Sequence, residues 1–152
     1  MNIAYFIKPK SSTSYIYDTS TLRQGIEKMR FHGFSAVPVL TKEGYYFGTV
    51  TEGDFLWNTY GNDDPKAEEH LKIHDIIRPD RTKPLNLQST MEEMLCKTME
   101  MNFVPVVDDR GYFVGIVTRK DVMRYYFEKY LARKEKSKKQ SAIPYTEGEG
   151  NL

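Results

Sequence analysis

The sequence predicts an α+β fold made of two β-α-β-β-α repeats. Three observations indicate this fold: a long internal duplication, segments that alternate between helical and extended periodicity, and turn residues that separate them. The chain has 152 residues, of which 39% are hydrophobic, which is enough for one compact domain or two small units with a packed core.

The duplication becomes visible when the sequence is shifted against itself by 67 residues. Residues 37–54 then align without a gap on residues 104–121, and nine of these eighteen positions are identical, where chance gives about one. We therefore divide the chain into repeat 1 with an N-terminal linker (1–61), a polar connecting segment (62–76), repeat 2 (77–132), and a basic and then disordered tail (133–152).

Repeat 1 begins with a short extended segment at residues 15–17. Residues 18–20 carry side chains that can cap the helix that follows. Apolar residues then recur at positions i, i+4 and i+7, which predicts one apolar face of a helix; they are Leu22, Ile26 and Met29.

The second half of repeat 1 predicts a β-hairpin and a helix. Residues 36–40 and 45–50 are two extended runs around a turn at residues 42–44, and the helix starts near Thr51 and ends at Gly61. Within this helix, the spacing of Phe55, Trp57 and Tyr60 favours a core position over an interface.

Repeat 2 follows the same plan, with an apolar face on its first helix formed by Met91, Met94, Leu95, Thr98 and Met99. Its first helix or the exit from it is shorter, because Leu22 precedes Pro38 by 16 positions whereas Met91 precedes Pro105 by 14. Proline cannot donate a hydrogen bond to a neighbouring strand, so both prolines predict edge strands of small sheets.

One motif occurs in both repeats at the start of the second helix. A glycine in the strand is followed by a threonine and, three residues later, an aspartate: Gly48, Thr51 and Asp54 in repeat 1, and Gly115, Thr118 and Asp121 in repeat 2. One interpretation is a capping box, in which the threonine and the aspartate satisfy the helix end. The other is a ligand site, because a helix N-terminus attracts anions and a carboxylate accepts bonds from ribose hydroxyls.

These motifs resemble the tandem cystathionine-β-synthase (CBS) domain pair, or Bateman module, over the chain as far as about Ala132. The resemblance rests on Val-Pro-Val, a Gly-Tyr turn and the Gly-x-x-Thr-x-x-Asp motif, each present twice. It implies two CBS repeats packed as a pseudo-twofold pair, and a non-catalytic regulatory module that binds an adenosine-containing nucleotide in a cleft between the repeats and signals to a partner protein. The shorter first helix of repeat 2 and its Thr-Arg-Lys sequence are similar to small stand-alone pairs that bind cyclic di-AMP.

The resemblance implies two clefts, each built from both repeats. The first and principal cleft is expected to contain Ser12, Ser14, Ile16, Phe34, Ser35, Pro38, Thr118, Arg119, Lys120 and Asp121. The second is expected to contain Thr51, Asp54, Arg81, Lys83, Met101, Asn102 and Pro105.

Charge distinguishes the two expected clefts. Arg119 and Lys120 place two cations where phosphate oxygens would lie, whereas Glu52 and Gly53 stand at the equivalent positions of the second cleft. The basic pair suits a ligand with two phosphates, such as cyclic di-AMP. The two aspartates equally suit the ribose of AMP, ADP or ATP, so a mononucleotide energy sensor stays open, as does a ligand-free scaffold or adaptor.

Other functions find little support in the sequence. Cys96 is the one cysteine, which excludes an internal disulfide and fits a reducing compartment, and no apolar run is long enough to span a membrane. We expect a cytoplasmic protein that is not an enzyme and has no metal or cofactor, because His70 and His74 lack a third ligand and no catalytic constellation is evident.

Two surfaces are expected to contact partners. Tyr125, Tyr126, Phe127 and Tyr130 are too many aromatic residues for one buried face, which predicts a partner or dimer surface, and the resemblance implies a homodimer. The basic segment at residues 133–140 predicts a solvated helix end, with contacts to acidic partners as the alternative. The net charge of +1 argues against nucleic acid as a partner.

Overall fold

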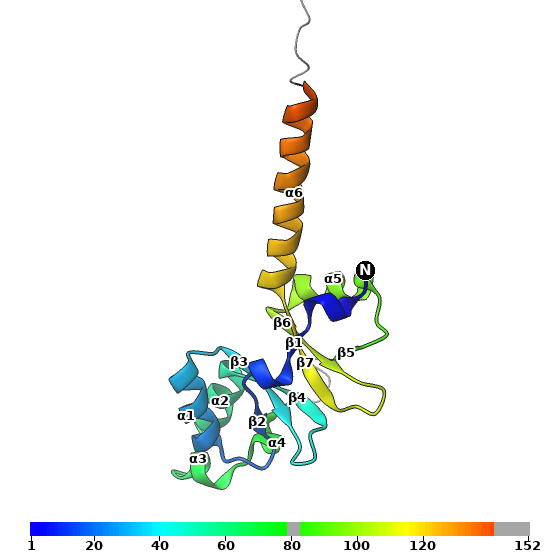
Figure 1. The fold of residues 1–152 in the computed structure, drawn as a ribbon. Helices are drawn as coiled ribbons and strands as arrows, with labels where there is room; N and C mark the ends of the chain where they lie inside the picture. The colour runs from blue at the N-terminus through cyan, green and yellow to red at the C-terminus, as the bar shows by residue number, and fades with distance from the viewer. Residues whose placement is uncertain (79–82, 142–152) are drawn as a thin grey trace, which may run out of the picture.

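Two small sheets, one from each repeat, lie at the centre of the molecule (Figure 1). The structure is a computed structural model that describes residues 1–78 and 83–141. Its elements confirm the predicted α+β fold, with the order β-α-β-β-α twice. They are η1 (Ile3–Phe6), β1 (Lys8–Pro9), η2 (Lys10–Ser12), β2 (Ile16–Tyr17), α1 (Leu22–His32), β3 (Ala36–Leu40), β4 (Tyr46–Thr51), α2 (Glu52–Thr59), α3 (Ala67–His70), α4 (Ile73–Ile76), β5 (Leu85–Asn86), α5 (Met91–Glu100), β6 (Phe103–Val107), β7 (Phe113–Thr118) and α6 (Arg119–Ser141).

The two β-hairpins have the same register. Val37 pairs with Val50 in repeat 1, and Val104 pairs with Val117 in repeat 2, each exactly one repeat offset apart in the sequence. The first helices differ in how they end: α1 has 11 residues and is followed by Gly33 in the left-handed conformation, whereas α5 has 10 residues and ends in extended backbone. This difference accounts for the shorter spacing in repeat 2.

The cap of α1 corrects a sequence prediction. Residues 18–20 were expected to cap this helix, but Thr21 does so: its hydroxyl accepts the Gln24 N–H, and the Gln24 side chain accepts the Thr21 N–H. The reciprocal pair of bonds requires Thr and Gln three positions apart, which Thr21 and Gln24 provide.

The prediction that Pro38 and Pro105 lie in edge strands is wrong. Their strands, β3 and β6, are interior strands in the orders β2-β3-β4 and β1-β7-β6-β5. The prolines are tolerated because the parallel neighbour is very short. β2 pairs only with Val39 and Leu40, so the ladder on that side ends before Pro38, and the missing N–H leaves no acceptor unpaired there.

Each repeat's core is completed by the segment that precedes the other repeat. Ile3 and Phe6 from the N-terminal segment are buried in the core of repeat 2. Ile73 and Ile76 of α4, in the segment expected to be a polar connection, are buried in the core of repeat 1. The crossings are related by the repeat itself, since Phe6 and Ile73 are 67 positions apart.

A glycine in each hairpin allows these segments to approach closely. A side chain on Gly115 would place its Cβ within 2.1 Å of the Lys8 carbonyl oxygen, because β1 pairs directly with β7 at this point. A side chain on Gly48 would come within 2.9 Å of a methyl group of Ile77. The repeated glycine therefore has a packing reason as well as the functional one considered above.

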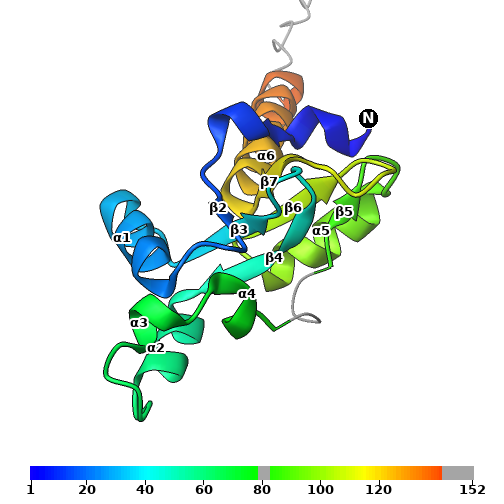
Figure 2. The same cartoon turned by 90° about the horizontal axis from the view of Figure 1, so that it is seen from below.

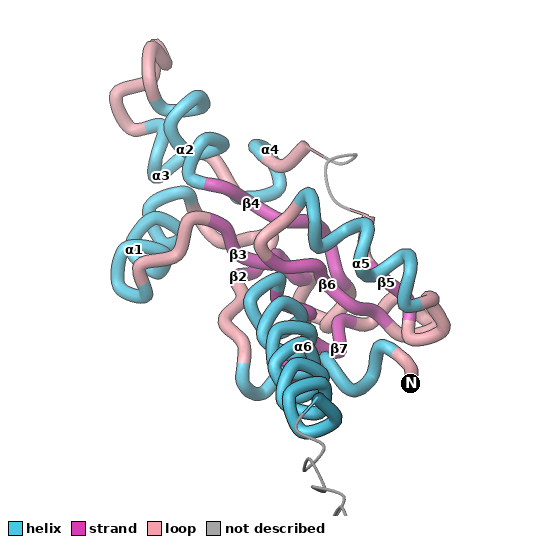
Figure 3. The backbone as a smooth tube through the Cα atoms, turned by 90° about the horizontal axis from the view of Figure 1, so that it is seen from above, coloured by secondary structure: helices cyan, strands magenta, loops and turns pink. Residues whose placement is uncertain are grey.

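The tips of the two hairpins join the repeats. The rings of Tyr45 and Tyr112 stack with centroids 4.4 Å apart, and the Tyr46 N–H donates to the Gly111 carbonyl oxygen at 3.1 Å. Figure 3, which looks down α6, shows the strands of both repeats meeting in the middle, with α1 to α3 on one side and α5 on the other.

Helix α6 is the longest element and projects away from the body of the molecule (Figure 1). It continues through residues 133–140, which the sequence assigned to a basic tail, and ends at Ser141. Residues 142–152, where the disordered tail was predicted, lie outside the described residues. At its base, Tyr125 packs edge-to-face on Phe6 of the N-terminal segment, which Figure 2 shows beside the start of this helix.

Candidate functional site

A cleft of about 270 Å³ lies between the repeats. Its walls come from β1 and the residues after it, from the start of β3 and from the two strands of the second hairpin. The lining residues are Lys8, Ser12, Thr13, Ser14, Phe34, Ala36, Val37, Pro38, Asn102, Phe103, Ile116 and Thr118. Five residues of the first predicted cleft therefore come together here: Ser12, Ser14, Phe34, Pro38 and Thr118.

The remaining residues of the first predicted cleft lie around this cavity or away from it. Ile16 is buried in the core of repeat 1, and Ser35 is exposed while its carbonyl oxygen accepts the Glu52 N–H at 2.9 Å. Lys120 is exposed at the base of α6, where it lines a second hollow. Asp121 lines a third hollow of about 380 Å³ beside Lys8.

Lys8 connects the cleft with the hollow that contains Asp121. It lines both spaces, because β1 runs antiparallel to β7 with Lys8 opposite Ile116. Its side chain therefore brings a cation to a cleft wall that is otherwise formed by hydroxyl groups and apolar atoms. The sequence reasoning missed Lys8, and nothing in its local sequence indicates a partner more than 100 residues away.

The repeated Thr-x-x-Asp motif adopts two different states. In repeat 1 it forms a capping box: the Asp54 carboxylate accepts the Thr51 N–H at 2.9 Å, and this aspartate is only 4% exposed. In repeat 2 the Thr118 hydroxyl accepts the Asp121 N–H at 3.1 Å, but the Asp121 side chain is 42% exposed. The capping interpretation accounts for Asp54, whereas Asp121 presents its carboxylate to solvent beside the cleft.

The buried end of β4 shows how tightly repeat 1 is packed at the equivalent place. The Tyr46 hydroxyl lies 2.8 Å from the hydroxyl of Thr49, which is itself buried. Burial raises the pKa of Tyr46 to about 12, and the hydrogen bond with Thr49 lowers it by less. This phenol stays neutral throughout the physiological range, so it supplies no charge to a ligand.

Arg119 holds the start of α6 against the end of α5. Its guanidinium donates to the carbonyl oxygens of Thr98 at 2.6 Å and Met99 at 3.1 Å, and to the Asn102 side-chain oxygen at 3.1 Å. These acceptors are at the C-terminus of α5, where a cation is favoured by the helix dipole. The phosphate role expected for Arg119 stays a prediction, and the structure gives this side chain three partners within the protein.

The residues of the second predicted cleft have separate surroundings. Thr51 and Asp54 cap α2, Met101 is the C-terminal cap of α5, and Pro105 is buried in β6. Lys83 is exposed, and its carbonyl oxygen accepts the Lys97 ammonium at 2.6 Å. Asn102 lines the first cleft. Arg81 lies outside the described residues.

Comparison with known families identifies the repeats. The family model described as the CBS domain matches residues 10–58 and 74–128, so it covers both repeats and most of the chain. The chain belongs to the CBS-domain family. The resemblance read from the sequence is thereby confirmed, and the cleft lies between its two CBS repeats.

Solved structures with the same fold include CBS-pair proteins with bound nucleotides. A structure of CbpB in complex with c-di-AMP is 23% identical, with a TM-score of 0.81 over 90% of this chain and 91% of that one. CbpB of Listeria monocytogenes, also in complex with c-di-AMP, is 22% identical, with a TM-score of 0.77 over 86% and 97%. CBSX2 in complex with AMP is 18% identical, with a TM-score of 0.69 over 85% and 98%.

Curated relatives are longer proteins. A homoserine O-acetyltransferase of Methanocorpusculum labreanum is 30% identical over 103 residues, which are 68% of this chain and 20% of that protein. The chain spans between 17% and 56% of the length of the three curated relatives that it matches.

Two further features bear on the candidate site. Among the described residues, no group of three or more histidine, cysteine, aspartate or glutamate side chains is placed to hold a metal ion. No helix within residues 1–78 and 83–141 has the length and apolar character needed to cross a membrane. Cys96, expected on the apolar face of α5, is exposed.

Proposed function

We propose that this CBS pair is a regulatory module that carries out no reaction of its own, binds an adenosine-containing nucleotide in the cleft between its repeats, and signals to a partner protein. The observation that carries the proposal is the cleft of about 270 Å³, which joins hydroxyl groups, an aromatic ring and the cation of Lys8 from both repeats. The bound c-di-AMP and AMP of structurally similar proteins support it.

The chemistry of the cleft suits the parts of a nucleotide. Phe34 and Pro38 offer apolar surface for a purine ring, and the hydroxyl groups of Ser12 and Ser14 offer hydrogen bonds. Lys8 and Lys120 supply cations for phosphate oxygens, which form strong charge-assisted bonds. Asp121 accepts hydroxyl protons of a ribose from its half-exposed position.

The space around Lys8 bears on which nucleotide binds. The cleft is small for a complete dinucleotide, since ligand pockets commonly enclose about 300 to 1,000 Å³. The neighbouring hollow of about 380 Å³, which contains Asp121, offers room for a second nucleoside. Cyclic di-AMP would use both spaces with Lys8 between its nucleosides, whereas AMP, ADP or ATP would use one.

Isothermal titration of the purified protein with AMP, ATP, cyclic di-AMP and S-adenosylmethionine tests the proposal. Tight binding of cyclic di-AMP with weak binding of AMP would identify a dinucleotide sensor, and binding of a mononucleotide alone an energy sensor. If none of the four binds, the proposal is wrong and an oligomerising scaffold becomes the better interpretation.

Substitution of Asp121 tests its role toward ribose. Asp121→Ala should weaken nucleotide binding by about 2 kcal/mol, or roughly thirtyfold, because a charge-assisted pair of hydrogen bonds is lost. Asp54→Ala should weaken it less, since the Asp54 carboxylate is buried in the cap of α2. Titrations of both variants with the preferred nucleotide measure this, and an unchanged affinity of Asp121→Ala would exclude the ribose role.

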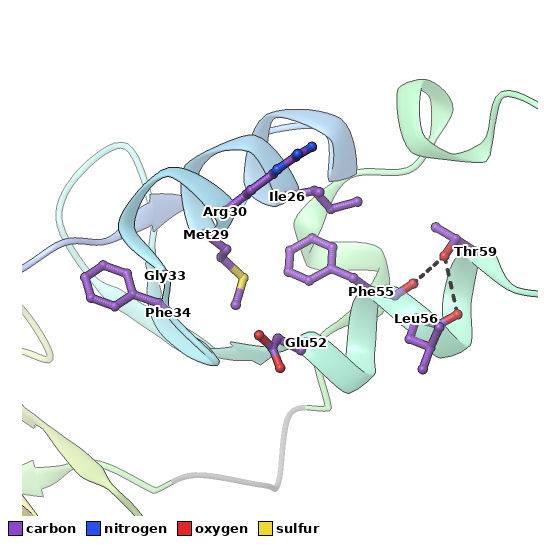
Figure 4. A pocket seen from close by; sticks show the side chains of 9 residues that line it. All are labelled: Ile26, Met29, Arg30, Gly33, Phe34, Glu52, Phe55, Leu56 and Thr59. Carbon is purple, nitrogen blue, oxygen red and sulfur yellow. Dashed lines mark hydrogen bonds between the residues drawn. The ribbon is translucent and has the colours of Figure 1, made fainter.

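We further infer that two copies associate through α1 and α2. An open groove of about 420 Å³ runs between these helices, and Figure 4 shows Ile26 and Met29 of α1 facing Phe55 of α2 across it. Trp57 and Tyr60 of α2 are 69% and 77% exposed, so the prediction that they belong to the core is wrong for both. Helix α2 has only eight residues and turns one face inward, which leaves these rings outside.

The same patch carries what a twofold contact requires. Exposed aromatic rings and an apolar groove lie side by side, so each copy can offer the one to the other. Arg30 and Glu52 both line the groove and give opposite charges to the two copies.

Light scattering during size-exclusion chromatography tests the association. Trp57→Ala should yield a monomer. Glu52→Arg should weaken association and the double variant with Arg30→Glu should restore it; a dimer in all variants would place the interface elsewhere.

A further inference from the structure

The outer part of α6 is exposed along its whole length. Every residue from Tyr126 to Ser141 is exposed, and Figure 1 shows this part of the helix standing clear of both repeats. The helix has 23 residues and is therefore about 34 Å long at 1.5 Å per residue. A surface of this length is available for a partner.

One face of this helix is apolar near its base. Met123, Phe127 and Tyr130 follow one another at intervals of four and three residues, the spacing of a continuous helical seam, and they are 64%, 59% and 60% exposed. The seam continues at the same spacing to Lys134, so its character changes from apolar to cationic along the helix.

The residues beside the seam are basic. Counting seven residues per two turns, Arg124, Arg133 and Lys138 occupy the positions that flank the seam, whereas Glu128 and Glu135 lie farther around the helix. The face therefore combines exposed rings with an excess of positive charge, although the chain as a whole is nearly neutral.

This charge pattern disfavours a second copy of α6 as the occupant. Side-by-side parallel pairing would bring Lys134 against Lys134 and place Arg133 beside the basic flank of the other helix, and like charges across an interface are strongly unfavourable. Complementarity instead requires a surface that is apolar at one end and acidic along its edges.

We propose that this face of α6 binds an amphipathic acidic segment of a partner protein. The apolar side chains of the segment pack on Phe127 and Tyr130, and its carboxylates meet Arg133 and Lys134. The proposal names the partner surface for the signalling function proposed above and rests on that function. The connection is direct in the chain, because Lys120 and Asp121 in the first turn of the same helix border the nucleotide cleft.

Fluorescence anisotropy of the full-length protein tests this surface. The probe is a fluorescein-labelled peptide of 18 residues made of Leu, Ala and Glu, with Leu at intervals of three and four; a scrambled peptide of the same composition is its control. Lys134→Glu, on the seam, should weaken binding of the probe at least tenfold, and Tyr130→Ala at least fivefold. The matched control Lys136→Glu makes the same charge change on the far side of the helix and should change affinity less than twofold.

Several results would overturn the docking proposal. Equal losses in Lys134→Glu and Lys136→Glu, or equal binding of the scrambled peptide, would show diffuse charge attraction only. Preferential binding of a single-stranded 20-nucleotide RNA or of vesicles containing 30% phosphatidylglycerol would assign the surface to another class of partner. Concentration-dependent association that Tyr130→Ala abolishes would assign it to a second copy.

A nucleotide titration in the same buffer separates this proposal from the one it rests on. Lys134→Glu should bind nucleotide as the wild type does, because Lys134 lies about four turns from the cleft. Loss of nucleotide binding in the wild type would contradict the proposed function, whereas loss of peptide binding alone would contradict the docking surface.

Discussion

Arg119 and Lys120 are neighbours in the sequence, yet the structure gives them different surroundings. Arg119 donates three hydrogen bonds to the end of α5, whereas Lys120 is exposed. The sequence predicted a basic pair acting together on phosphate. It could not distinguish the two residues, because the acceptors of Arg119 lie about 20 positions earlier and are mostly backbone carbonyls, which every residue has.

Exchange of these two residues separates stability from binding. Arg119→Ala should lower the free energy of unfolding by about 2 kcal/mol, because charge-assisted bonds are lost and carbonyl oxygens are left without a donor. Lys120→Ala should leave stability within about 0.5 kcal/mol and weaken nucleotide binding instead. Urea denaturation and titration calorimetry of both variants measure the two effects. Equal stability of the two variants would show that the Arg119 bonds contribute nothing net.

Single residues of the first cleft were predicted unevenly. The residues that follow from the repeated motif or from its resemblance, such as Ser14, Phe34 and Thr118, do line the cavity. Lys8 and Asn102 were missed or assigned to the other cleft. Their positions depend on how β1 and the end of α5 cross the second hairpin, and such long-range pairing leaves no periodic signal in the sequence.

At the level of elements, helix α3 depends on one carboxylate. Asp64 accepts the Lys66 N–H at 2.9 Å and lies 2.6 Å from Nδ1 of His70, the last residue of α3. The Lys66 N–H, followed by the bond to His70, holds the pKa of Asp64 below its usual value. The ionised form is therefore the one that the folded state favours.

This shift predicts how the contribution of Asp64 depends on pH. Because the pKa is lower in the folded state, the stabilisation is fully present above the unfolded value of about 3.9 and is lost as the pH falls through the folded value. The difference in unfolding free energy between the wild type and Asp64→Asn should be constant above about pH 5 and shrink below about pH 4. A difference that grew on acidification would contradict the assigned contacts.

The elements themselves were predictable because the duplication allowed each to be read twice. The helices, the hairpins and their common register follow from two copies with matching periodicity. Two element-level expectations failed, the edge position of Pro38 and the burial of Trp57. Both depend on the length of a neighbouring element, two residues for β2 and eight for α2, and periodicity determines lengths poorly.

At the level of the whole molecule, the crossing of β1 over β7 is the most sensitive contact. Gly115→Ala should destabilise the protein by about 2 to 3 kcal/mol, since the new Cβ would lie 2.1 Å from the Lys8 carbonyl oxygen and backbone must shift. It should also weaken nucleotide binding, because β1 carries Lys8. Denaturant unfolding and calorimetry of the variant test both expectations.

Gly48→Ala is the matched control for this prediction. Its Cβ would meet a methyl group of Ile77 at 2.9 Å, and a side-chain end can move where a backbone cannot. Its effect on stability should therefore be smaller than that of Gly115→Ala. The opposite order would show that the β1 segment yields more easily than the packing of Ile77.

The role of the connecting segments could not be read from the sequence. Residues 62–76 are mostly polar, and Ile73 and Ile76 are isolated among charged neighbours. Their burial arises because repeat 1 leaves part of its core open and the chain must pass that opening on its way to repeat 2. A sequence pattern describes one segment at a time, whereas this packing is a property of two.

The reciprocal exchange of Phe6 and Ile73 has a consequence for how the fold can be divided. Neither repeat is a contiguous folding unit, so a fragment that starts at residue 77 would lack the N-terminal strand and two of its own core residues. Such a fragment is expected to stay unfolded until a peptide of residues 1–9 is supplied. In a single-repeat ancestor, the same exchange would have run between two chains as a swapped dimer, and duplication would have turned that association between molecules into folding within one.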